Sequence, residues 1–207
     1  MSSLQLKVDK TAFDQIAGAS QATEQQVTQA VTNSLRKLGK HIATIVKRET
    51  AKEARVPQKA LGRRIYASPV NAGDSKMTVW VGTYAIEAVN VGTPTVYGVP
   101  GKSGGVKVGR MKYPGAFIAQ IYTADKKVWI RKGSKHFSSD LYPTKRRGGS
   151  RLSAGLSGRF PVVRAAIPVD AIVERVFSEN SAEFGDFFSK TFARELNFQV
   201  NVKGAAT

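Results

Sequence analysis

The sequence predicts an α+β protein, and three observations carry that prediction. An apolar stripe with helical spacing runs through residues 24–54, β-branched and aromatic residues dominate 65–91, and a helical pattern returns after residue 170. With 207 residues, of which 42% are hydrophobic and 23% charged, the chain is long enough to bury a core. We expect a long N-terminal helix and a C-terminal helix packed on a mainly antiparallel sheet, with long glycine-rich and basic loops.

The N-terminal helix is the clearest element. Its apolar residues recur at steps of three and four, which places them on one face; they are Val27, Val31, Leu35, Leu38, Ile42 and Ile45. Thr23 followed by Gln26 fits a capping box at the start, and Pro57 marks the end. This organisation predicts an N-terminal arm over 1–22, a single α+β domain over 23–198 and a C-terminal tail over 199–207.

Shorter elements follow from local patterns. Strands are predicted at 65–70, 77–91 and 106–108, a short helix at 58–64, a hairpin from 116–122 and 127–131, and an extended segment at 160–169. Asp170 can cap a helix that ends near Phe177, and Asn180 with Glu183 resembles a second cap. Residues 197–207 are expected to fray or form an arm.

The charge is high and uneven. The chain has 32 Lys and Arg against 15 Asp and Glu, a formal net charge of +17. Residues 131–164 contain nine basic residues and only Asp140 as an acid, whereas 165–207 are mildly acidic. Such a balance favours nucleic acids or acidic protein surfaces as partners. The chain lacks cysteine, which excludes disulfides and a thiol nucleophile. No apolar stretch reaches about 18 residues and no signal peptide is recognisable, so we expect no membrane partner and a cytoplasmic site of synthesis.

Motifs that would indicate an enzyme are incomplete. Gly101-Lys102-Ser103 resembles part of a phosphate loop, but Val96 stands where the motif needs its first glycine. Gly101-x-Ser103-x-Gly105 has nucleophile-elbow spacing without the flanking strand and helix. His41 and His136 are too few for a typical zinc site. Glu183 and Asp186 could serve as an acid–base pair or form a solvated helix face. We predict no enzymatic activity, no cofactor and no metal.

Two sets of residues remain as candidates for function. The basic segment could face DNA phosphates, dock on an acidic partner, or simply be solvated; its residues are Arg131, Lys132, Lys135, Lys145, Arg146, Arg147 and Arg151. Phe184, Phe188 and Phe192 repeat every four residues near the C-terminus. This aromatic stripe fits either a core face or an interface between subunits.

Several segments together resemble the lambda-like prophage minor tail protein Z family. They are Arg55-Val56-Pro57, Leu61, Arg63-Arg64, Gly105-Val106-Lys107-Val108-Gly109, Tyr113-Pro114-Gly115-Ala116-Phe117-Ile118-Ala119, Val128-Trp129-Ile130-Arg131 and Phe192-Ala193-Arg194-Glu195-Leu196-Asn197. The resemblance spans about residues 20–200. Its most specific part is the Pro-Gly-Ala-Phe-Ile segment followed by the aromatic–Arg strand end. Residues 134–158 depart from the family pattern and look like a basic loop insertion.

The resemblance implies a structural virion protein that completes the tail of a bacteriophage. Members of the family act where the tail joins the head, so the expected assembly is a homo-oligomeric ring, with six subunits as the expected number. Its expected partners are a tail terminator or tail tube protein, head-completion proteins and the genomic DNA in the channel. The expected location is the tail or neck of the virion. The alternative from the residues alone is a free, sequence-independent nucleic-acid-binding protein.

Overall fold

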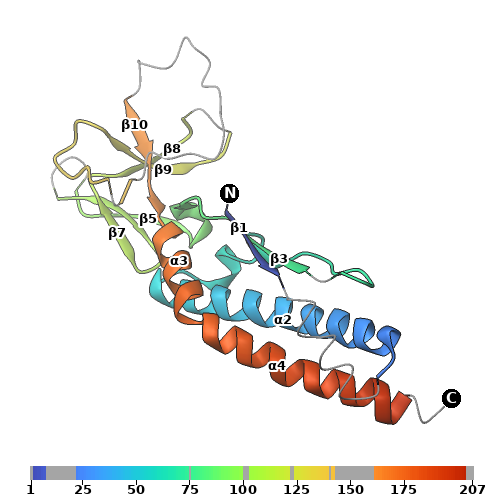
Figure 1. Ribbon diagram of the computed structural model, residues 1–207. Helices are drawn as coiled ribbons and strands as arrows, with labels where there is room; N and C mark the ends of the chain where they lie inside the picture. The colour runs from blue at the N-terminus through green and yellow to red at the C-terminus, as the bar shows by residue number, and fades with distance from the viewer. Residues whose placement is uncertain are drawn as a thin grey trace. The chain divides into compact units, whose positions relative to one another are not determined.

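The computed structural model describes residues 2–7 as backbone, and 22–74, 76–99, 103–121, 124–139, 141–142 and 161–203 (Figure 1). It confirms the α+β fold class, with two long helices and small antiparallel sheets. The chain divides into two compact units. Unit 1 comprises Met1–Glu49, Gly62–Gly82 and Glu174–Thr207, and unit 2 comprises Thr50–Leu61 and Thr83–Val173.

The long helix α2 (Glu24–Glu53) has the start and the buried stripe that its sequence predicts. The amide of Thr23 donates to Oε1 of Gln26 at 2.9 Å, and the amide of Gln26 donates to Oγ1 of Thr23 at 3.3 Å. These reciprocal bonds are a capping box, which satisfies amides that a helix start leaves without partners. The residues of the predicted stripe are buried, from Val27 to Ile45.

In unit 1, α2 is covered on two sides. On one side lies the sheet β1 (Ser2–Lys7), β3 (Lys76–Val81) and β2 (Ile65–Ala67), with β3 in the middle. Gly39 contacts that sheet so closely that an added Cβ would lie 2.7 Å from the Met77 sulfur. On the other side runs α4 (Ser181–Asn197), antiparallel to α2 (Figure 1). Strand β1 lies within the predicted N-terminal arm, for which the sequence pattern predicts no strand.

The C-terminal region of unit 1 differs from the prediction at two points. The helices α3 (Asp170–Glu179) and α4 follow one another as expected, but Asn180 does not cap α4 with its side chain. The side-chain amide nitrogen of Asn180, Nδ2, instead donates to the carbonyl oxygen of Val176 at 2.6 Å, at the end of α3. The expected fraying after residue 197 is also wrong for Phe198–Lys203, which forms a π-helical segment, η3, with Gln199 buried.

Unit 2 is built from short strands in three small antiparallel sheets, not from one continuous sheet. The sheets have the orders β5-β6-β7, β8-β9-β10 and β4-β11. Their strands are β4 (Ile86–Glu87), β5 (Pro94–Tyr97), β6 (Gly105–Val108), β7 (Met111–Pro114), β8 (Phe117–Ala119), β9 (Lys127–Arg131), β10 (Val162–Arg164) and β11 (Ala166–Ile167).

Pairing of β8 with β9 confirms the predicted hairpin. The predicted helix at 58–64 is instead a single 3₁₀ turn, η1 (Gln58–Ala60), and a second such turn, η2 (Ala88–Asn90), follows β4.

Candidate functional site

A cavity of about 720 Å³ in unit 2 is the best candidate for a functional site. One part of its lining is polar and is formed by Arg131, Ser134, Lys135 and His136. The rest is apolar or glycine backbone, and it comprises Val96, Gly104, Gly105, Gly115, Ala116, Phe117, Ile118, Gly133 and Pro161. No acidic residue lines this cavity among the residues that the structure describes.

The polar wall is held by successive turns after strand β9. The amide of Ser134 donates to the carbonyl of Arg131 at 3.0 Å, and the amide of Phe137 donates to the carbonyl of Ser134 at 2.9 Å. The Ser134 hydroxyl oxygen accepts from the amide of His136 at 3.3 Å. Because these bonds fix the backbone from 131 to 137, the three basic side chains leave a defined turn.

The glycine wall exists because the backbones approach too closely for side chains. An added Cβ at Gly105 would lie 2.3 Å from the carbonyl oxygen of Tyr113 on the paired strand β7. Gly115 has a φ of +69°, and its Cβ would lie 3.0 Å from both Ser134 and His136. Glycine at 105 therefore lets β6 and β7 approach each other closely, and glycine at 115 lets the chain after β7 pack against the polar turn.

Arg131 and Lys135 are both exposed. Neither forms an ion pair with another residue that the structure describes, so no described carboxylate neutralises these two cations. The contrast is Glu87, which accepts from both Lys127 and Arg164. Burial raises the pKa of Glu87, but the hydrogen bonds and charges of these two cations outweigh it and hold the pKa below the usual value. The ion pairs of Glu87 thus involve residues that do not line the cavity.

A second row of cations lies on the β5-β6-β7 sheet. Thr95 pairs in register with Lys107, and Lys107 with Lys112, so all three side chains share one face. All three are exposed, and the Lys112 ammonium lies 5.8 Å from the ring centroid of Tyr97. This face is opposite to that of Val96, which lines the cavity.

Below the hairpin, two tyrosines share an aromatic cluster with Phe137. The rings of Tyr113 and Tyr142 are 6.0 Å apart in an edge-to-face arrangement, and both residues are fully buried. Burial raises the pKa of Tyr113 to about 12 and raises that of Tyr142 further still. Neither phenol group has a hydrogen-bond partner among the described residues. Both phenols therefore stay protonated, and their main role is to fill the core beneath the hairpin.

The structure brings together some of the predicted site residues and leaves others apart. Arg131 and Lys135 line the cavity, whereas the exposed Lys132 does not. Its amide instead donates to the carbonyl of Pro161 at 2.8 Å. The remaining predicted basic residues, Lys145, Arg146, Arg147 and Arg151, lie outside the described residues. His136 and Ser134 were missed as ligand-binding candidates, although both stand in the basic segment.

The phenylalanine stripe belongs mainly to the core of unit 1. Phe184 is 2% exposed and Phe192 is 5% exposed, so the packing of this chain itself occupies both side chains. Phe188 is half-buried and stacks on Phe192, with 6.1 Å between ring centroids. Of the three residues predicted at an oligomer interface, Phe188 alone presents side-chain surface to solvent in appreciable amount.

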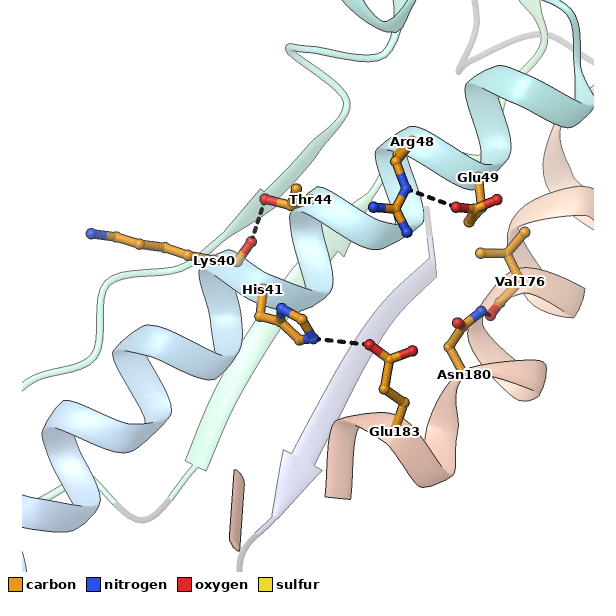
Figure 2. A network of polar contacts seen from close by, with 8 residues as sticks. All are labelled: Lys40, His41, Thr44, Arg48, Glu49, Val176, Asn180 and Glu183. Carbon is orange, nitrogen blue, oxygen red and sulfur yellow. Dashed lines mark hydrogen bonds and ion pairs between the residues drawn. The ribbon is translucent and has the colours of Figure 1, made fainter. Parts of the chain in front are cut away.

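Polar side chains tie α2 to α4 in unit 1, and Figure 2 shows part of this network. Nε2 of His41 lies 3.3 Å from Oε1 of Glu183, and the imidazole stacks on Phe187 with 3.9 Å between centroids. Arg48 pairs with Glu49 on α2 itself, and the hydroxyl of Thr44 donates to the carbonyl of Lys40. Glu183, considered above as part of an acid–base pair with Asp186, is thus a partner of His41.

No group of three or more His, Cys, Asp or Glu side chains that could hold a metal ion occurs in the described ranges. Within the same ranges, no helix is long and apolar enough to cross a bilayer. Searches for similar proteins returned no matching family model, no matching curated protein and no matching solved structure.

Proposed function

We propose that this chain is a structural protein of a tailed bacteriophage, built into a ring at the head-proximal end of the tail. In this proposal the protein helps to join tail to head around the DNA channel, and it has no catalytic role. The resemblance to the minor tail protein Z family motivates the proposal. Three of the segments that carry the resemblance, 105–109, 113–119 and 128–131, contribute residues to the cavity of unit 2.

The observation that carries the proposal is the distribution of charge between the two units. Unit 1 has 14 basic and 10 acidic residues, whereas unit 2 has 18 basic and five acidic residues. An excess of this size repels itself and is relieved when a polyanion or an acidic protein surface lies beside it. A subunit in a ring around DNA, with further rings above and below, has both kinds of neighbour.

A phage with a stop codon early in this gene tests the proposal. We expect tails and DNA-filled heads to accumulate separately, and a plasmid copy of the gene to restore joining. Cryo-electron microscopy of purified wild-type tails should show the protein as a closed ring at the head-proximal end. Joined particles in the absence of the protein, or density for it only at the distal tip, would contradict the proposal.

The second candidate is a free nucleic-acid-binding protein, which the exposed row of Lys107 and Lys112 beside Tyr97 favours. Such a protein would bind DNA by itself, with an affinity that falls steeply as salt rises. The double variant Lys107→Gln/Lys112→Gln should then lose binding and reduce the salt slope by about two. The double variant Lys40→Gln/Lys190→Gln is the matched control, because both lysines are also exposed but belong to unit 1. Equal effects of both changes, or negligible binding at about 150 mM salt, would argue against this candidate.

A further inference from the structure

The lining of the cavity in unit 2 combines a cationic part and an apolar part. A nucleic-acid phosphate backbone would use only the cationic part. The cavity's polar wall offers two permanent cations, an imidazole and a hydroxyl from Arg131, Lys135, His136 and Ser134. Its remaining wall offers aliphatic and aromatic surface, with Val96 and Ile118 among the contributors. Val96 itself is 60% exposed, so part of this apolar surface is open to solvent.

Contacts to DNA phosphates come from cations and amides that follow the backbone, and unpaired bases stack on aromatic faces. In the apolar part of the described lining, Phe117 is the one aromatic side chain on which a base could stack, whereas Val96 and Ile118 match aliphatic groups. A protein segment with a carboxylate next to an aliphatic side chain matches both walls at once. The carboxylate would accept from the guanidinium of Arg131 and the ammonium of Lys135, and the aliphatic group would cover the apolar wall.

We propose that this cavity is a docking site for a segment of a partner protein in which acidic and aliphatic residues alternate or adjoin. No carboxylate belongs to the described lining, so an acidic side chain of a partner would meet Arg131 and Lys135 without competition from that lining. A volume of about 720 Å³ accommodates a few side chains, in the range of typical ligand sites. The inference rests on the proposed function in one respect, since the partner would be a neighbouring protein of the same particle.

The test uses the full-length protein and a defined probe, the peptide acetyl-Asp-Leu-Asp-Leu-amide. Amide signals in a ¹H–¹⁵N spectrum are followed during titration, because Gly104, Gly105, Gly115 and Gly133 lie along the lining of the cavity. We expect shifts that concentrate at these glycines. The peptide acetyl-Asn-Leu-Asn-Leu-amide, which keeps the size and the leucines without the charge, should bind about tenfold more weakly or not at all.

Two lysines of the same turn provide the matched variants. Lys135→Gln and Lys132→Gln each remove one positive charge from an exposed side chain, but only Lys135 lines the cavity. We expect Lys135→Gln to weaken binding of the acidic peptide about tenfold and Lys132→Gln to change it less than twofold. Equal effects would mean that the peptide senses only net charge, and they would overturn the proposal.

A short DNA duplex serves as the competing ligand. Displacement of the peptide by DNA from the same glycine signals, with a steep salt dependence, would assign the cavity to nucleic acid and overturn the proposal. The two proposals fail separately. A ring in phage tails with no peptide binding removes only the docking site, and peptide binding by a protein absent from tails removes only the proposed function.

Discussion

The two units of this protein differ in how they neutralise their charge. In unit 1, side chains of α2 meet carboxylates of α4: the ammonium of Lys37 pairs with Glu195, and Nε2 of His41 lies beside Glu183. In unit 2, Glu87 accepts from two cations, and the cations around the cavity have no carboxylate beside them in the described chain. In the described residues, unit 1 therefore pairs charged side chains of two helices with one another, whereas in unit 2 the described ion pairs gather at Glu87.

The units also differ in how they pack. Unit 1 places a long helix between a sheet and a second helix, so apolar side chains fill the space between its layers. Unit 2 joins short strands through backbone contacts at glycines, where no side chain fits. The first kind of packing tolerates small changes by shifting side chains, and the second does not, because backbone atoms have nowhere to move.

The largest expected effect tests this difference in packing. Gly105→Ala should destabilise unit 2 by about 3 kcal/mol, since its Cβ would lie 2.3 Å from a backbone oxygen. Gly185→Ala in α4 is the control, because its Cβ meets nothing within 4 Å and alanine favours a helix by about 1 kcal/mol. Hydrogen exchange should show lost protection in β6 and β7 with unchanged protection in α2. Equal loss of protection in both units would mean that their packing does not differ in its tolerance of small changes.

The second prediction concerns the ion pairs of unit 2. Glu87→Gln leaves Lys127 and Arg164 without a counter-charge, and Arg164 also lies over the Trp129 ring at 5.3 Å. We expect a loss of about 2 kcal/mol at neutral pH, as for a partly buried pair that loses one partner. Chemical denaturation followed through the fluorescence of Trp129 measures it, with Trp80→Phe as the common background.

The pH dependence of that loss has a defined sign. The pKa of Glu87 in the folded protein lies below the ordinary value of 4.5, so the carboxylate stabilises the fold above that value. This contribution disappears as the pH falls through the folded pKa. The difference between wild type and Glu87→Gln should therefore be constant near neutral pH and shrink below pH 4.5. A difference that persists unchanged in strong acid would contradict the ion-pair explanation.

The sequence was most informative where structure depends on neighbours in the chain. The helical stripe of α2 and its capping box are local patterns, and both were predicted correctly. The strand β5 was missed, because its pairing with β6 spans a glycine-rich loop that carries no pattern of its own. Strand β1 was missed for a similar reason, since it pairs with the distant β3. The cap at Asn180 was predicted from its spacing to Glu183, but the end of α3 competes for that side chain.

The candidate site shows the same limit. Charge in the sequence indicated Arg131 and Lys135, but it could not show that Gly105, Gly115 and Val96 meet them across a cavity. These residues come together because segments of the chain approach closely at glycines. Glycine permits such an approach, but a glycine in the sequence does not show that one occurs. The only local signal was the clustering of glycines at 98–115, which is equally typical of a loop. A pattern of β-branched and aromatic residues at Thr95, Val96 and Tyr97 could have suggested the missing strand.

The smallest expected effect is in unit 1. The hydrogen bond from Lys37, opposed by burial and aided by Asn33, holds the pKa of Glu195 below its usual value. Because Lys37 is 59% exposed, solvent screens this pair, and we expect Glu195→Gln to cost only about 1 kcal/mol. Denaturation at low and high salt measures it, and most of the loss should vanish at high salt. A larger effect than that of Glu87→Gln would reverse the comparison, since unit 1 would then depend more on its ion pairs than unit 2.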